Sequence, residues 1–310
     1  MKAVRYHSYG DSDVLVYEDA DRPVAGPGQV VVKVAGTSFN PVDAAIRAGF
    51  LEQVFPVTLP HVPNFDVAGN IAEVGEGVSG WSVGDAVVAF LPMTAPGAAA
   101  EYVAAPAETL AAAPRTGELA DAAALPSAGL AAWQALFEHA GLKTGQSVLI
   151  NGAGGAVGGY AVQLAAQAGA TVTATASARS IDRIRFYGAD RIVDYTATPV
   201  LQALAGQRFD LVLNLAPTSP EETAQLVGLV ADGGAFVSTT TPGPEDAGRG
   251  VRTVRVFARS DASQLAELVA RVDAGDLEIE VAERLPLADL AAVHDRAAAG
   301  RLAGKTVLTP

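Results

Sequence analysis

Three glycines at a regular spacing are the residues of this chain that most clearly indicate chemistry. Gly152, Gly155 and Gly158 form a G-x-x-G-x-x-G pattern between an apolar, β-rich run and an Ala-rich run of helical period. A glycine turn from a strand into a helix lets free N–H groups and the helix dipole hold a pyrophosphate. The first glycine permits the turn, the second lets the backbone approach the phosphates, and the third allows close helix packing. We therefore predict a dinucleotide site formed by Gly152, Ala153, Gly154, Gly155, Ala156, Val157 and Gly158.

The end of the following strand indicates which dinucleotide binds. An acidic residue about 20 positions after the glycines usually bonds the ribose 2′-OH of NAD, but here the sequence is Ala176-Ser177-Ala178-Arg179, with no acid before Asp182. Ser177 can donate a hydrogen bond to a 2′-phosphate, and Arg179 can donate a forked, charged one. These residues predict NADP(H) as the cofactor. The alternative is that Ser177 caps the next helix and Arg179 is a solvated surface charge.

The composition restricts the class of protein. Half of the 310 residues are apolar, with 32 Gly and 18 Pro, which fits a compact globular protein of about two domains. The net charge of −13 argues against nucleic acid or anionic membrane as a partner. Without cysteine there is no disulfide, thiolate metal site or catalytic thiol. No apolar run is typical of a leader or a membrane span, so a cytoplasmic location is expected.

The elements that must position these residues change in character along the chain. Up to about residue 115 the runs are short, β-like and separated by turn residues, which predicts a small, mostly antiparallel barrel. From Ser147 strands and helices alternate, which predicts a doubly wound parallel sheet. The tail is too short for a domain and is expected to rejoin the barrel. The predicted strands are 147–152, 171–176, 191–194, 210–215, 234–239 and 251–258, and the predicted helices are 119–136, 156–169, 180–188, 220–231 and 261–274.

Short motifs follow one another in a recognisable order along nearly the whole chain. They are Asn40-Pro41-Val42-Asp43, Asp66-Val67-Ala68-Gly69, Gly84-Asp85, Ala100-Glu101-Tyr102-Val103, Leu125-Pro126-Ser127-Ala128-Gly129 before Trp133, Gly188-Ala189-Asp190 leading to Asp194-Tyr195, and Gly304-Lys305-Thr306-Val307-Leu308. With the glycine turn, this order resembles the quinone oxidoreductase branch of the medium-chain dehydrogenase/reductase superfamily. The resemblance implies an α/β protein with a GroES-like catalytic domain at 1–118 and 276–310, a Rossmann domain at 119–275 that binds NADP(H), and an active site in the cleft between them. It also implies a homodimer, with the strand at 251–258 pairing across a two-fold axis.

The resemblance further implies an activity and a set of site residues. The activity is hydride transfer from NADPH to a quinone or an α,β-unsaturated carbonyl. In such proteins the residue matching Asn40 lies near the nicotinamide, and those matching Ser177, Arg179 and Tyr195 surround the 2′-phosphate, with Arg301 as a weaker candidate. From the residues alone, Asn40 is equally a turn residue before proline, and Tyr195 equally a packing residue. The candidates for the substrate pocket are Phe50, Phe55, Asn64, Leu91 and Met93.

Several positions depart from the family's pattern. Zinc-dependent members usually carry Gly-His-Glu where this chain has Pro63-Asn64-Phe65-Asp66, and the four histidines show no ligand spacing, so no metal is expected. Phe50 stands where close relatives often have tyrosine, and Ala131 where threonine is usual. Asn64 replaces a glycine and either narrows the pocket or donates to a carbonyl. Asp43 is expected to pair with Arg47, one helical turn further on.

Together these observations predict a zinc-independent, NADPH-dependent reductase of quinones or activated alkenes, with a small-molecule substrate and no nucleic-acid or membrane partner. A quinone is electron-poor and water can supply the proton, so orientation of the cofactor and acceptor would provide most of the rate. One alternative is an enoyl or alkenal reductase without physiological quinone activity. The other is an NADPH-binding sensor or structural protein with negligible turnover, which Phe50 and Ala131 motivate.

Overall fold

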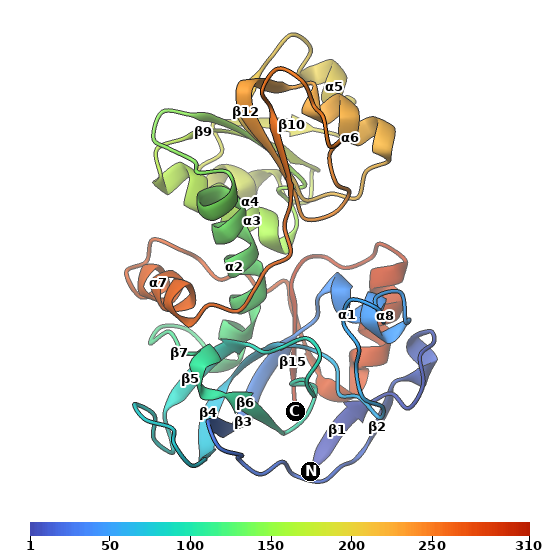
Figure 1. Cartoon of the computed structure of the whole chain (residues 1–310), viewed down its shortest axis with the longest axis vertical. Coiled ribbons are helices and arrows are strands. Elements are labelled where there is room, and N and C mark those ends of the chain that lie inside the picture. Colours follow the sequence, from blue (N-terminus) through green and yellow to red (C-terminus); the bar gives the residue numbers. More distant parts are fainter. The chain divides into compact units, whose positions relative to one another are not determined.

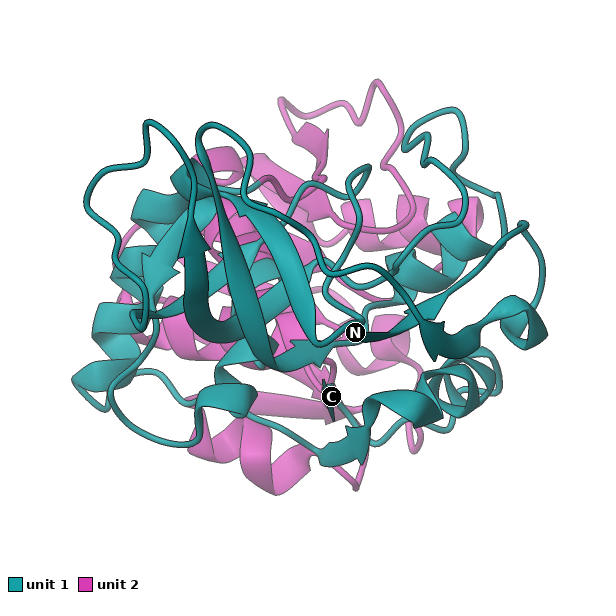
Figure 2. Cartoon of the chain, turned by 90° about the horizontal axis from the view of Figure 1, so that it is seen from below, with its two compact units in different colours: residues 1–127, 260–310 teal, residues 128–259 magenta.

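The computed structural model describes the whole chain, residues 1–310, which forms two compact units. The first unit consists of Met1–Ser127 and Ser260–Pro310, and the second of Ala128–Arg259. Figure 2 shows them in different colours. The second unit is thus inserted into the sequence of the first, so residues from both ends of the chain contribute to one fold.

A mostly antiparallel sheet is the frame of the first unit (Figure 1). Its strands are β3 (Gln29–Ser38), β4 (Asp66–Val74), β5 (Ala86–Phe90), β6 (Tyr102–Pro106), β7 (Leu110–Ala112), β14 (Glu283–Pro286) and β15 (Thr306–Thr309). They run in the order β14-β15-β3-β4-β5-β7, with β6 also paired to β3, and only β14 and β15 pair in parallel. β15 pairs antiparallel with β3, so the prediction that the tail rejoins the barrel is confirmed. The strands β1 (Lys2–Arg5) and β2 (Val16–Asp19) form a separate antiparallel pair.

The helices of the first unit begin at residues suited to helix starts. α1 (Pro41–Arg47) has proline at its first position, where the missing N–H costs nothing. α7 (Ala262–Asp273) is capped by Asp261, whose carboxylate accepts from the N–H groups of Ser263 and Gln264. α8 (Leu290–Ala298) completes this set. Short 3₁₀ segments lie at Ser12–Val14, Ala107–Thr109, Leu119–Ala124 and Leu287–Asp289.

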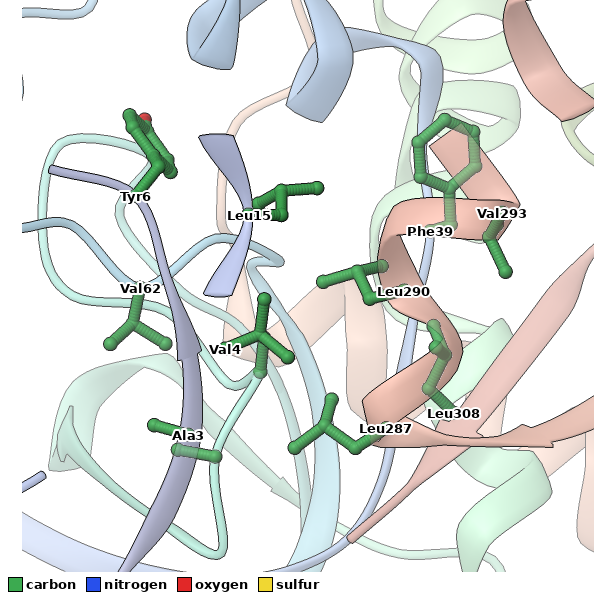
Figure 3. Close-up of a cluster of buried hydrophobic side chains, with 12 residues drawn as sticks. Ala3, Val4, Tyr6, Leu15, Phe39, Val62, Leu287, Leu290, Val293 and Leu308 are labelled. Carbon is green, nitrogen blue, oxygen red and sulfur yellow. The ribbon is translucent and has the colours of Figure 1, made fainter. Parts of the chain in front are cut away.

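A buried hydrophobic cluster ties the N-terminal strands to helix α8 (Figure 3). Figure 3 shows Phe39 beside Val293 and Leu290 of this helix. The Phe39 ring also meets His294 edge-on, with ring centroids 4.7 Å apart. Because Phe39 stands two residues before α1, this packing fixes the place where α1 starts.

The second unit is built on a parallel sheet, as the strand–helix alternation predicts (Figure 1). Its strands are β8 (Ser147–Asn151), β9 (Thr171–Ala176), β10 (Arg191–Asp194), β11 (Phe209–Asn214), β12 (Val230–Ser238) and β13 (Arg252–Arg255). The order β10-β9-β8-β11-β12-β13 reverses direction between β8 and β11. Ligands of such sheets bind beyond the carboxyl ends of the strands at that reversal. The helices are α2 (Pro126–Trp133), which starts in the first unit, α3 (Ala156–Gln167), α4 (Ile181–Phe186), α5 (Val200–Ala203) and α6 (Pro220–Val227), with a π-helical segment at Gln134–His139.

The boundaries of the compact units lie elsewhere than the predicted domain limits of 1–118 with 276–310 and 119–275. Leu119–Ala124 packs on β3 so tightly that a Cβ on Gly36 would lie 2.4 Å from the carbonyl oxygen of Ala120. Helix α7 packs against β7, and the Asp273 carboxylate accepts from the Arg115 N–H at 2.7 Å. Both segments therefore belong to the first unit, while the functions assigned to the two domains stay predictions.

Candidate active site

The glycine turn lies at the carboxyl end of β8, directly before α3. Gly152 has φ of +91°, a conformation that favours glycine, and its N–H donates to the Thr175 hydroxyl at 2.8 Å. A Cβ on Gly158 would lie 2.5 Å from both the Ala153 Cα and the Gly152 carbonyl oxygen. These two glycines are therefore required by the chain's own backbone, which brings α3 directly against the turn.

Gly155, the N-cap of α3, has no such internal requirement. A Cβ there would meet only the Gly152 carbonyl oxygen, at an ordinary 3.5 Å. The first N–H groups of a helix have no partner within the helix. A side chain at position 155 would therefore fill the open space beside the free N–H groups of α3. The turn is also held from α4, where Arg183 donates to the Gly154 carbonyl at 2.8 Å. A dinucleotide pyrophosphate fits this open backbone.

The residues predicted to contact a 2′-phosphate lie at the same edge of the sheet. Ser177 follows β9, and its hydroxyl makes no hydrogen bond within the chain. The N-cap of α4 is Ser180, three residues further on. The alternative that Ser177 caps this helix is therefore wrong. Arg179 is exposed and has no ion-pair partner in the chain. Tyr195 follows β10, is 51% exposed, and donates its N–H to the Ala176 carbonyl at 3.3 Å, which places it beside the end of β9.

A buried amide network at the strand ends was not predicted from the sequence. Asn151 ends β8 and Asn214 ends β11, and the Asn151 amide donates to the Asn214 side-chain oxygen at 2.8 Å. The Thr175 hydroxyl donates to the Asn151 side-chain oxygen at 3.0 Å. Asn214 is fully buried, so each polar atom needs a partner. In the sequence, an asparagine ends each of two apolar runs, and this pattern could have indicated the network. This network joins the strands at the reversal of the sheet and supports the glycine turn.

The first unit contains a buried cluster of charged and polar groups around Asp66, at the start of β4. Asp66 is 0% exposed. Its Oδ2 accepts from Ser38 Oγ at 2.8 Å, Asn40 Nδ2 at 2.9 Å, Ser127 Oγ at 2.7 Å and Lys305 Nζ at 3.2 Å. Its Oδ1 accepts from the Ser127 N–H at 2.8 Å. Sequence reasoning missed the cluster, although an acid and a lysine inside apolar β-like runs were a usable signal.

Asn40 lies at the edge of this cluster and is partly buried. Its side-chain oxygen accepts from Lys305 Nζ at 2.6 Å and shares, at 3.2 Å, the Ser127 hydroxyl that also donates to Asp66. Lys305 Nζ also lies 3.4 Å from the Phe39 carbonyl. Asn40 is the residue that the family resemblance places near the nicotinamide. Its side chain is held by Asp66, Ser127 and Lys305, which come from distant parts of the sequence.

Asp43 does not pair with Arg47, so that prediction is wrong. The Asp43 carboxylate accepts from the N–H of Asn40 at 2.8 Å and of Asn64 at 3.2 Å, whereas two guanidinium nitrogens of Arg47 are buried without partners. Burial raises the pKa of Asp43 to about 7, although these backbone donors oppose the rise, and the neighbouring charge of Asp66 adds to it. The carboxyl therefore changes charge near neutral pH.

The predicted substrate-pocket residues separate into two groups. Asn64 and Met93 line one small pocket in the first unit, together with Tyr6 and Asp43. Asn64 has φ of +66° and is 2% exposed, and neither the Nδ2 nor the Oδ1 of its side-chain amide has a hydrogen-bond partner. Three other predicted residues do not line this pocket: Phe50, which is 84% exposed, Phe55, and Leu91, which is buried. Arg301 lies in the exposed turn after α8, also in the first unit.

The chain's donor groups do not fit a catalytic zinc ion. No three or more His, Asp or Glu side chains converge as a metal site, and there is no cysteine. His61 packs against Tyr6 with ring centroids 5.4 Å apart, and burial lowers its pKa to about 4. His294 packs against Phe39, and burial lowers its pKa to about 3. Both act as neutral packing groups in the interior.

Two family models match the chain: "Alcohol dehydrogenase GroES-like domain" over residues 26–115 and "Zinc-binding dehydrogenase" over residues 187–308. A chloroplast envelope quinone oxidoreductase homolog of Arabidopsis thaliana is 41% identical over 71% of this chain and 69% of its own length. The 2-methylene-furan-3-one reductase of Solanum lycopersicum is 31% identical over 100% of this chain and 79% of its own length.

Solved structures agree with these relatives in fold. The quinone oxidoreductase of Coxiella burnetii has a TM-score of 0.90 and 29% identity, covering 100% of this chain and 99% of its own. A mycobacterial protein complexed with NADPH has a TM-score of 0.86 and 27% identity, covering 100% of each chain. The fold and the glycine turn define an NAD(P)H-dependent oxidoreductase. The chain belongs to the medium-chain dehydrogenase/reductase superfamily, in its quinone oxidoreductase branch.

The structure has no helix with the length and apolar character required to cross a bilayer. The relatives include proteins named as chloroplast and mitochondrial forms. The cytoplasmic location expected from the sequence stays a prediction.

Proposed function

We propose that this protein is an NADPH-dependent, zinc-independent reductase that transfers hydride to a quinone or an α,β-unsaturated carbonyl. The observation that carries the proposal is the edge of the parallel sheet in the second unit. There Gly155 leaves the start of α3 open, and the Ser177 hydroxyl and the Arg179 guanidinium have no partners in the chain. A 2′-phosphorylated dinucleotide would use all three features.

The preference for NADPH follows from the charges at that edge. From Ala176 to Arg179 the loop after β9 carries a hydroxyl and a guanidinium but no carboxylate. A guanidinium forms strong, bidentate hydrogen bonds to phosphate, and a carboxylate there would repel it. Tyr195 can add its hydroxyl from the adjacent strand end. These residues would hold the 2′-phosphate, while the first turn of α3 would hold the pyrophosphate.

The proposed reaction requires little acid–base catalysis by the protein. When bound, NADPH supplies the hydride. Asn40 would donate an amide N–H to a carbonyl of the nicotinamide or of the acceptor, which orients that group and stabilises negative charge on its oxygen. Because the donor groups of the chain do not form a zinc site, hydrogen bonds alone would orient and stabilise that oxygen.

Two acceptor classes are compatible with these residues. The quinone oxidoreductase homologues support a quinone, and the Solanum lycopersicum reductase supports an enone. The structure of the first unit favours neither, because the pocket beside Asn64 is small. The quinone is the first acceptor to test, and an alkenal or enone is the second.

We also propose that the protein is a homodimer that pairs through β13. This strand is the last in the sheet order, so one of its edges has no neighbour within the chain. Phe257, just beyond it, is 54% exposed beneath the Arg255 guanidinium, 4.7 Å from its ring centre. Light scattering should give twice the 31.5 kDa mass of the chain, and a monomer at working concentration would refute the pairing.

The proposed activity is tested by NADPH oxidation with a simple quinone and with a cyclic enone, after treatment with a metal chelator. NADH is run in parallel at equal concentration. We expect rapid NADPH consumption with at least one acceptor, little with NADH, and no effect of the chelator. Loss of activity on chelation would overturn zinc independence. NADPH binding without turnover of any acceptor would overturn the reductase and favour a sensor.

A further inference from the structure

We propose that Lys305 and Asp66 are positioning residues that lock the side-chain amide of Asn40 in one orientation and so present a single free N–H to a carbonyl ligand. The identity of that ligand, the nicotinamide carboxamide or the acceptor carbonyl, rests on the proposed function. The lock itself rests only on contacts within the first unit.

The chemistry of the two neighbours determines the orientation. Lys305 Nζ lies 2.6 Å from Asn40 Oδ1, and Asp66 Oδ2 lies 2.9 Å from Asn40 Nδ2. An ammonium group can only donate, and an ionised carboxylate can only accept. Rotating the amide by half a turn would place its NH₂ against the ammonium and its oxygen against the carboxylate. Both contacts would then be repulsive, so only one orientation is stable.

Counting the hydrogen bonds shows which group remains free. The Asn40 side-chain oxygen accepts from Lys305, and one of the two hydrogens of the Asn40 amide goes to Asp66. The single hydroxyl hydrogen of Ser127 is shared between Asp66 Oδ2, at 2.7 Å, and the Asn40 oxygen, at 3.2 Å. The second amide hydrogen has no partner in the chain. Asn40 is partly exposed, whereas the side chains of Lys305 and Asp66 are 3% and 0% exposed. The locking charges are thus shielded from water, and the free N–H belongs to the partly exposed residue.

The lock is rigid because each member is held independently. Asp66 also accepts from Ser38 Oγ and from both the N–H and the hydroxyl of Ser127. Lys305 directly precedes β15, which is paired with β3. Asn40 caps α1, whose start is fixed by the packing of Phe39. An amide held in this way loses little conformational freedom when a ligand binds, which is the advantage of a pre-organised donor.

A double-mutant cycle on turnover tests the lock. We expect Asn40→Ala to lower kcat about 100- to 1000-fold, the range seen for loss of one donor to a developing oxyanion. Lys305→Met should lower kcat in the same direction, and should have no further effect on kcat in the Asn40→Ala background. Lys33→Met, at an exposed lysine of β3, is the matched control and should leave kcat unchanged. Equal effects of Lys305→Met in both backgrounds would show that Lys305 does not act through Asn40.

A milder variant covers the case in which Lys305→Met does not fold. Ser127→Ala removes the hydroxyl that is shared between Asp66 and the Asn40 oxygen, but it leaves Lys305 and Asp66 paired and keeps the N–H of residue 127 on Asp66. It should lower kcat less than Lys305→Met does, and its effect should also disappear in the Asn40→Ala background. An effect that persists there would contradict the lock.

A second measurement decides the question even if no acceptor is turned over. The side-chain amide signals of Asn40 can be assigned in ¹⁵N NMR spectra by their loss in Asn40→Ala. Rotation about the amide C–N bond is slow in every asparagine, so the useful readout is the ¹⁵N order parameter of the side-chain NH₂ group, which reports motion about the Cβ–Cγ bond. We expect an order parameter close to that of the rigid backbone in the wild type and a lower one in Ser127→Ala. A side-chain amide as mobile as that of an exposed asparagine in the wild type would overturn the lock. A rigid amide in a protein that oxidises no NADPH would retain the lock and overturn the proposed function instead.

Discussion

The two units use polar groups in opposite ways. In the first, the cluster around Asp66 is charged, buried and nearly saturated by the chain's own donors. In the second, the edge of the parallel sheet is supported by neutral amides, and its backbone donors and the Arg179 guanidinium remain unpartnered. The first arrangement fixes a side chain in place, and the second leaves space and charge for an anionic ligand.

The difference has an energetic consequence. Removing one member of a buried ion pair leaves an uncompensated charge, whereas removing one member of a neutral network leaves an unpaired dipole. The first unit should therefore be more sensitive to substitution in its polar cluster. The second should lose ligand affinity before it loses stability.

The largest effect is expected from Asp66→Ala compared with Asn214→Ala. Asp66→Ala strands Lys305 in the interior and should lower the free energy of unfolding of the first unit by about 3–5 kcal/mol. Asn214→Ala should cost the second unit about 1–3 kcal/mol. Urea unfolding can be followed in each unit separately by fluorescence in single-tryptophan backgrounds: Trp133→Phe leaves Trp81 to report the first unit, and Trp81→Phe leaves Trp133 to report the second. Equal losses of unfolding free energy in the two variants would show that the buried charge of Asp66 does not make the first unit more sensitive than the second.

The second comparison lies within the glycine turn. Gly158→Ala forces a Cβ to 2.5 Å from backbone atoms and should destabilise the second unit by about 1–3 kcal/mol. Gly155→Ala meets no chain atom closer than 3.5 Å and should leave the melting temperature nearly unchanged. It should nevertheless weaken NADPH binding measured by fluorescence titration. If Gly155→Ala binds NADPH as tightly as the wild type, the open cradle is not the pyrophosphate site.

The third prediction concerns the choice of cofactor. Arg179→Ala should raise the Kd for NADPH about tenfold or more, because a charge-assisted hydrogen bond contributes about 1.5–3 kcal/mol. The Kd for NADH should change little. Arg185→Ala is the control, since Arg185 lies on α4 and pairs with Asp182 at the surface. Equal weakening of NADPH and NADH by Arg179→Ala would remove the basis for NADPH preference.

The smallest effect is the pH dependence of the first unit. The pKa of Asp43 is raised from 3.8 to about 7 in the folded state, so that state holds the proton more tightly than the unfolded chain does. Proton binding by Asp43 therefore adds to the free energy of unfolding, fully below about pH 4, and this contribution is lost as the pH rises through about 7. Between pH 6 and 8 the free energy of unfolding should fall by about 1 kcal/mol. Urea unfolding should show this decline in the wild type, and Asp43→Asn should show less of it. An identical pH profile for both proteins would contradict the assignment.

The features that the sequence revealed are those set by local geometry. Gly152 and Gly158 lie at their predicted turn because a strand, a tight turn and a helix are encoded within a dozen neighbouring residues. The ion pair of Asp66 and Lys305 joins residues 239 positions apart, and no spacing rule connects them. The predicted pairing of Asp43 with Arg47 failed for the same reason. A backbone donor from Asn64 reaches the carboxylate from outside α1, which a helical spacing rule does not consider.

A single-turnover experiment shows whether hydride passes from NADPH to an acceptor on this protein. The protein is mixed with one equivalent of NADPH carrying deuterium at the transferable position of the nicotinamide, and then with an excess of quinone or cyclic enone. We expect the NADPH absorbance to decay after mixing with at least one acceptor, and the saturated product of the enone to carry the deuterium at its β-carbon. Bound NADPH that stays reduced with every acceptor, or a saturated product without deuterium, would show that the protein does not transfer this hydride.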